Sequence, residues 1–195
     1  MLNKIFNGLL IFALLVFSGC SGNQFLNRET PPVGTKVVVV EFSDFNCPAC
    51  RSASELATKV KSIPNLYLEF RHLPLPLKGH DNSNIAANAF ECARSQNFGD
   101  KMENALFENQ GNLSEELFLQ IPKIYNFGEK FDFVKFERCV VKNEFGDLVG
   151  KDLSFARGKN LNSTPTFFVN GVQTPRGNLL EVIAAEFEKL KGKSG

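Results

Sequence analysis

F-S-D-F-N-C-P-A-C-R, residues 42–51, is the stretch that decides the fold. It places Cys47 and Cys50 three positions apart, after the apolar run at residues 37–40 and before a segment with apolar residues at helical spacing. A strand therefore leads into a helix. Pro48 falls on the first helical position, where its missing N–H would be unpaired in any case. This order predicts that Cys47 is the N-cap of the helix.

The predicted place of Cys47 favours a reactive sulfur. Unpaired N–H groups and the positive end of the helix dipole stabilise a thiolate at a helix N-terminus. Stabilisation of the Cys47 thiolate beyond what the helix dipole supplies requires hydrogen bonds to its sulfur from the N–H of Ala49 and from the N–H or S–H of Cys50. We expect Cys47 to be the nucleophile and Cys50, one turn further on, to be the resolving thiol. A C-x-x-C pair in this context is typical of a thioredoxin-like redox site.

Two other interpretations of the cysteine pair are half of a zinc site and a purely structural disulfide. Zinc needs two more ligands, and the remaining candidates lie at no finger-like spacing: Cys92, Cys139, His72 and His80. A disulfide across so short a loop would be strained and would stabilise little. The redox interpretation is therefore favoured, and we predict neither a metal nor a cofactor.

The first 34 residues predict export and a membrane anchor. The mostly apolar run at residues 5–17 is shorter than the roughly 20 residues that span a bilayer, and it is typical of a signal peptide over residues 1–19. S-G-C at its end resembles a bacterial lipobox, with phenylalanine where leucine is usual. Cys20 is then the lipidated first residue of a membrane-anchored lipoprotein of the periplasm or cell envelope, and residues 20–34 form a tether. The alternative is ordinary cleavage nearby.

Composition narrows the function classes. The chain has 22 Lys and Arg against 21 Asp and Glu, mixed along its length, so nothing indicates nucleic-acid binding. Five cysteines in an exported chain indicate an oxidising compartment.

Glu41 is the exception in a first strand that is apolar on both faces. A carboxylate in such a strand is costly unless it has a task or a path to solvent. We interpret Glu41, six residues before Cys47, as a buried acid that exchanges a proton with Cys50. The alternative is a glutamate at the end of the strand that points to water. Asp44 is interpreted as a loop or cap residue.

The other elements follow from periodicity and turn signals: a strand parallel to the first at residues 66–73, four or five helices within 82–159, a hairpin at 164–174 and a final helix at 179–190. This order predicts the α/β class. It is that of a thioredoxin fold, formed by residues 35–77 and 160–191, that is split by an all-helical insertion domain at residues 78–159.

The chain resembles the DsbA-like thiol-disulfide oxidoreductases, in a branch with many exported and lipid-anchored bacterial members. The resemblance covers residues 35–191. It rests on five motifs: V-E-F-S-D-F-N-C-P-A-C (40–50), F-R-H-L-P-L (70–75), A-A-N-A-F-E-C-A (86–93), A-L-F-E-N-Q (105–110) and S-T-P-T-F-F-V-N-G (163–171).

The resemblance implies an enzyme that exchanges its Cys47–Cys50 disulfide with cysteines of client proteins, as a disulfide-forming oxidase. It makes Glu41 the buried acid of the strand and Pro165 a cis-proline that faces the disulfide. Thr164 would offer its backbone to a client peptide by strand addition. The partners implied are client proteins with cysteines and a membrane redox partner of the DsbB or DsbD type, with no nucleic acid.

Ala49 is a departure from the strongly oxidising DsbA proteins, which carry histidine at this position. Alanine donates no side-chain hydrogen bond and places no positive charge near the Cys47 sulfur, so the redox potential should be intermediate. A disulfide reductase or isomerase is therefore an alternative. An alternative of another class is a lipid-anchored peptide-binding or chaperone module without turnover.

Cys92 and Cys139 lie on predicted helices of the insertion, on or beside apolar faces. A bridge between them would close a loop of about 48 residues, which corresponds to about 4 kcal/mol of stability. We expect a structural disulfide, as some relatives in this branch carry a second bridge. Two buried free thiols or a reactive pair are the alternatives.

Overall fold

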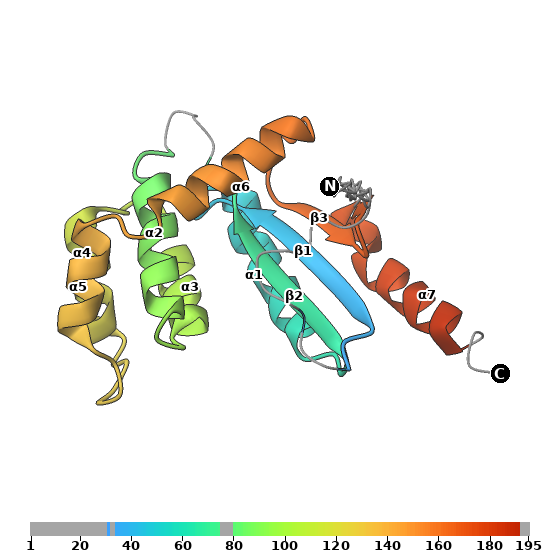
Figure 1. Ribbon diagram of the computed structural model, residues 1–195, viewed down its shortest axis with the longest axis horizontal. Coiled ribbons are helices and arrows are strands. Elements are labelled where there is room, and N and C mark those ends of the chain that lie inside the picture. Colours follow the sequence, from blue (N-terminus) through green and yellow to red (C-terminus); the bar gives the residue numbers. More distant parts are fainter. Residues whose placement is uncertain (1–30, 32–33, 75–79, 192–195) are drawn as a thin grey trace, which may run out of the picture.

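A computed structural model describes residue 31 and residues 34–74 and 80–191. The predicted signal peptide, Cys20 and most of the tether lie outside the described residues. Figure 1 shows two groups of elements: a twisted sheet with helices against it, and a cluster of helices to one side.

The elements occur in the order that the sequence predicts. They are β1 (Val37–Ser43), α1 (Pro48–Lys61), β2 (Leu66–His72), α2 (Ser83–Arg94), α3 (Gly99–Glu108), α4 (Glu115–Ile124), α5 (Phe133–Val141), α6 (Gly146–Gly158), β3 (Thr166–Val169), β4 (Val172–Thr174), the short 3₁₀ turn η2 (Arg176–Asn178) and α7 (Leu179–Lys191). The predicted α/β class is confirmed.

The sheet has the strand order β2-β1-β3-β4. β1 pairs in parallel with β2, as predicted, and antiparallel with β3. β3 then pairs antiparallel with β4 across the predicted hairpin. All seven residues of β1 are buried because it is a central strand with helices over both of its faces. Any polar side chain on β1 is thus held away from bulk water.

The alternation of valines along β1 supplies two separate cores. Val37 and Val39 pack on one face with residues of α1 and α7. Val38 and Val40 point to the opposite face, where Ala156 of α6 joins them. α6 runs across from the helical cluster to the sheet (Figure 1) and contacts both α2 and β2. The domain boundary at residue 159 stays a prediction, because α6 contributes to the packing of both groups.

A cluster of phenylalanines joins the cysteine motif to the helical group. The ring of Phe45 lies 5.5 Å from Phe70 of β2, 5.6 Å from Phe90 of α2 and 5.1 Å from Phe107 of α3, between ring centroids. Aromatic pairs at such distances contribute about 0.5–1.5 kcal/mol each beyond the area they bury. The loop that leads to Cys47 is therefore anchored by three different elements.

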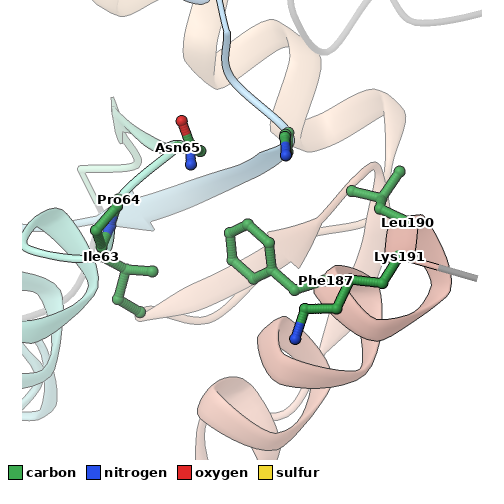
Figure 2. Close-up of a pocket in the computed structure, with 7 residues that line it drawn as sticks. Ile63, Pro64, Asn65, Phe187, Leu190 and Lys191 are labelled. Carbon is green, nitrogen blue, oxygen red and sulfur yellow. The ribbon is translucent and has the colours of Figure 1, made fainter. Parts of the chain in front are cut away.

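A surface groove of about 720 Å³ lies beside the turn between α1 and β2 (Figure 2). Its lining comes from the α1–β2 turn, the start of β1 and the end of α7: Lys36, Ile63, Pro64, Asn65, Phe187, Leu190 and Lys191. The 14 residues of α1, at about 1.5 Å per residue, place this groove about 20 Å from Cys47. It is separate from the cysteine pair. No helix in the described part of the chain combines the length and hydropathy needed to cross a bilayer.

Candidate active site

Cys47 is the N-cap of α1 and Pro48 occupies the first helical position, as the sequence predicts. The carbonyl of Cys47 accepts hydrogen bonds from the N–H of Cys50 at 3.0 Å and of Arg51 at 3.2 Å, which close the first turn. Both cysteines of the motif are free thiols. Cys47 keeps 7% of its surface exposed, whereas Cys50 is fully buried. Of the two cysteines, only Cys47 thus retains any exposed surface.

The predicted hydrogen bonds from Ala49 and Cys50 to the Cys47 sulfur are not formed. Cys47 Sγ instead lies 3.4 Å from the carbonyl oxygen of Thr164, to which its S–H donates. The hydrogen bonds that a stabilised thiolate would require stay a prediction, because the sulfur in this structure is a thiol that donates to Thr164.

Thr164 and Pro165 reach the cysteine pair from a part of the chain more than 110 residues away. The Thr164–Pro165 peptide bond is cis and directly precedes β3. Because β3 pairs with β1, this bend lies at the same end of the sheet as the start of α1. The structure thus brings together four residues that the sequence singles out: Cys47, Cys50, Thr164 and Pro165.

Cys50 and Glu41 are the two buried titratable groups behind Cys47. Burial raises the pKa of the Cys50 thiol to about 12. The hydroxyls of Ser43 and Thr164, which find no fully formed hydrogen bond among the described residues, moderate this rise. Cys50 therefore holds its proton firmly in the dithiol form.

Glu41 lies in the middle of β1, between Phe70 of β2 and Phe167 of β3, with 1% of its surface exposed. This burial excludes the alternative of a glutamate that points to water. Burial, and next the charge of Glu103, raise the pKa of Glu41 to about 8, while Ser43 and two more distant cations act in the opposite direction. The Ser43 hydroxyl lowers the pKa of both Glu41 and Cys50, although it forms no full hydrogen bond with either.

This arrangement agrees with the comparison to known proteins. A family model described as Thioredoxin matches residues 33–183, more than three quarters of the chain. The chain belongs to the thioredoxin family.

Among solved structures, this thioredoxin-family chain is similar to DsbA2 of Pseudomonas aeruginosa, with a TM-score of 0.60 and 25% identity over 77% of this chain and 88% of that one. It is also 28% identical to the probable disulfide bond formation protein D of Bacillus cereus, over 77% of this chain and 71% of that protein. The predicted DsbA-like resemblance, and with it the thioredoxin fold with a helical insertion, is confirmed.

A further relative is the Na(+)/H(+) antiporter NhaA 1 of Salinispora arenicola, which is 29% identical over 81% of this chain. The match covers 23% of that protein, so the chain spans less than a quarter of its length. The thioredoxin-family segment is what the two proteins share.

Cys92 and Cys139 are joined by a disulfide with an S–S distance of 2.01 Å, and they link α2 to α5 of the thioredoxin-family chain. Both cysteines are buried in the core of the helical group. Because they bind each other, they are not available to complete a zinc site with Cys47 and Cys50.

Sequence reasoning did not identify a buried polar cluster next to the thioredoxin-family motif. Asp44 Oδ1 accepts hydrogen bonds from the N–H of Asn46 at 2.8 Å and from Ser83 Oγ at 2.7 Å, and Asp44 Oδ2 pairs with His80 Nδ1 at 2.7 Å. Asp44 is a loop residue, as interpreted, but it also ties the loop to the start of α2. Ser83 and His80 lie more than 35 positions from it, so no local pattern indicates these contacts.

The parent protein should lose stability as the pH rises, because the buried Glu41 ionises. We predict that Glu41→Gln removes this loss. The pKa of Glu41 is raised from 4.5 to about 8 in the folded chain, so the folded state binds more protons than the unfolded state between these values. The contribution of protonated Glu41 to the free energy of unfolding is present in full below about pH 4.5 and is lost as the pH rises through about 8. The stability gained by the non-ionising variant over the parent should grow with pH above about 5 and level off above about pH 8, at about 5 kcal/mol.

Urea unfolding of both proteins at several pH values measures this difference, with the exposed Glu116→Gln as a control that should track the parent. A difference between Glu41→Gln and the parent that does not change with pH would contradict the assignment.

Proposed function

We propose that the chain is an exported thiol:disulfide oxidoreductase that exchanges its Cys47–Cys50 disulfide with cysteines of client proteins, in the direction of client oxidation. The observation that carries the proposal is the contrast within the motif. Cys47 lies at a helix N-terminus beside the Thr164 carbonyl and keeps 7% of its surface exposed, whereas Cys50 is fully buried. Such a pair suits attack at one sulfur and resolution by the other.

The proposed cycle begins with the Cys47–Cys50 disulfide. A client thiolate attacks Cys47 Sγ, the bond between the two protein sulfurs breaks, and Cys50 leaves as a thiolate. A second client thiolate then attacks the client sulfur in the mixed disulfide, which releases Cys47. The client loses two electrons and two protons, and the protein ends as a dithiol.

Glu41 is the proposed proton donor to Cys50 in this cycle. The pKa of Cys50 is raised to about 12 and that of Glu41 to about 8, so a thiolate formed at Cys50 takes a proton from the acid rather than the reverse. The Ser43 hydroxyl acts on the pKa of both groups and could carry the proton between them. In the reverse reaction, the Glu41 carboxylate would remove the same proton from Cys50.

A client peptide is proposed to bind along Thr164 and Pro165, with its main chain paired to the backbone of Thr164. Main-chain pairing does not depend on the side chains of the client, which suits an enzyme that acts on many clients. The dithiol produced would be reoxidised by a membrane partner of the DsbB type, whereas a DsbD-type partner would keep it reduced for the reductase alternative. We place the enzyme in the periplasm or cell envelope, anchored through a lipid on Cys20.

Ala49 decides how strongly oxidising the pair is, because it supplies no side-chain donor to the Cys47 thiolate. We expect a reduction potential between those of thioredoxin, about −270 mV, and DsbA, about −120 mV. Ala49→His adds one charge-assisted hydrogen bond of roughly 1.5–3 kcal/mol, which should raise the potential by about 30–60 mV.

Equilibration of both proteins with glutathione, followed by thiol trapping, measures the two potentials. A parental value at or below that of thioredoxin would contradict the oxidase direction and favour a reductase. The control places a histidine elsewhere on α1. Arg51→His serves because position 51 is exposed, whereas Ala53→His would bury the ring in the core.

A further inference from the structure

The side chain of Gln110 reaches from the helical group into the cysteine motif. Its amide nitrogen donates one hydrogen bond to the carbonyl of Phe45 at 2.8 Å and a second to the carbonyl of Cys47 at 2.9 Å. Both hydrogens of the amide are thereby used. The Cys47 carbonyl is the same one that accepts from the N–H groups of Cys50 and Arg51, so Gln110 completes the environment of the N-cap residue.

The position of Gln110 is itself fixed by contacts on both ends of α3. At the start of α3, Lys61 Nζ of α1 binds Asp100 at 2.7 Å and Glu103 at 2.8 Å. Near its end, the ring of Phe107 packs on Phe45. Gln110, two residues beyond α3, is therefore a donor held at a set place rather than a side chain free to reorient.

These two hydrogen bonds matter differently in the two redox states. In the reduced state the Cys47 sulfur can carry a negative charge, and the carbonyl oxygens of Phe45 and Cys47 are negative dipole ends close to it in the chain. Donation by Gln110 neutralises part of that dipole charge and holds Cys47 at the N-terminus of α1. In the disulfide the sulfur is neutral, so the same dipoles have little effect on it.

We propose that Gln110 is a positioning residue of the active site that stabilises the reduced, thiolate form of Cys47 and so makes the Cys47–Cys50 disulfide more oxidising. The inference rests on one part of the proposed function, namely that Cys47 and Cys50 cycle between the dithiol and the disulfide. The reduction potential of the Cys47–Cys50 pair would then depend on the helical group, which contributes this donor, as well as on the C-x-x-C motif.

Gln110→Glu tests the proposal because it keeps the size of the side chain and replaces the two donors by acceptors. The full chain is equilibrated with reduced and oxidised glutathione, and the state of Cys47 and Cys50 is read by thiol trapping. We expect the equilibrium to shift about tenfold or more toward the disulfide, which is a potential lower by about 30 mV or more. Gln110→Ala, which only removes the donors, should shift it about three- to tenfold in the same direction.

Gln120→Glu is the matched control. It makes the same change on α4, where Gln120 is exposed and its amide lies 3.3 Å from Glu116 Oε1. Its glutathione equilibrium should stay within about twofold of the parent, since the exposed contact between Gln120 and Glu116 involves no residue of the cysteine motif. The Ala variant keeps the test valid if Gln110→Glu does not fold.

If Gln110 only holds the two groups of elements together, the expected result is different. Gln110→Ala would then lower the melting temperature of the oxidised and reduced forms equally and leave the glutathione equilibrium within about twofold of the parent. This result would overturn the proposal. The positioning role instead lowers the melting temperature of the reduced form more than that of the oxidised form. A parent that equilibrates with glutathione but oxidises no client would contradict the proposed function and leave this inference standing.

Discussion

Cys47→Ser and Cys50→Ser are both expected to reduce client oxidation to the uncatalysed rate, but only Cys50→Ser is expected to accumulate a covalent adduct, formed when Cys47 attacks a client disulfide. Cys47 is the one of the two cysteines that retains exposed surface, and its sulfur lies beside the Thr164 carbonyl at the proposed client position. Without it no mixed disulfide forms. Without Cys50 the protein cannot form its own disulfide, so it oxidises no client. Its Cys47 thiolate can still attack a client disulfide, and no Cys50 thiol is then present to displace the client from the mixed disulfide.

Oxidative refolding of a reduced client measures the turnover, and non-reducing electrophoresis of cells or extracts measures the adducts. The expected pattern is no adduct with Cys47→Ser and a long-lived adduct with Cys50→Ser. The double variant Cys92→Ser with Cys139→Ser is the control, since it removes two cysteines without touching the motif. Refolding assistance that survives Cys47→Ser unchanged would contradict the enzyme and favour a binding or chaperone module.

The double variant Cys92→Ser with Cys139→Ser is expected to lose about 4 kcal/mol of stability and to keep its activity per folded molecule. The disulfide joins positions 47 residues apart, and closing a loop of this length restricts the unfolded chain strongly. It links α2 to α5 inside the core of the helical group. Serine hydroxyls left in that apolar core add a further cost.

Denaturant unfolding and client oxidation, measured on the same samples, test this second prediction. The expected result is a lower midpoint of unfolding and an unchanged rate at temperatures where the variant is folded. Adding Cys47→Ser to the double variant should abolish activity without lowering stability further, which separates the two roles. Loss of activity at unchanged stability would show that Cys92 and Cys139 form a reactive pair instead.

The local part of the active site could be predicted from residues close together in the chain. Pro48 sets the start of α1 because its fixed φ is helical and it has no N–H to lose, and this alone places Cys47 at the N-cap. The run of valines and the period of the apolar residues define β1 and α1 in the same way. Glu41 could be singled out because a charged residue within an apolar strand conflicts with its surroundings.

The orientation of the Cys47 sulfur could not be predicted from these residues. It depends on Thr164, which meets Cys47 only because β3 pairs with β1. Resemblance to the DsbA-like proteins indicated that Thr164 lies there, but not that its carbonyl takes the S–H in place of the helix donors. The contact of α6 with the sheet escaped prediction for a related reason, since an amphipathic pattern shows that a face is buried but not what covers it.

The sequence by itself determined which elements form, where Cys47 lies on its helix and which strand carries Glu41, because these follow from the preferences of neighbouring residues. Only the tertiary structure decided the surroundings of Cys47. Gln110, His80 and Ser83 reach the cysteine loop from the helical group, and each makes a hydrogen bond or ion pair across 35 or more positions. A glutamine after a helix has the same local pattern whether it faces water or an active site, so its role depends on how the two groups of elements pack together.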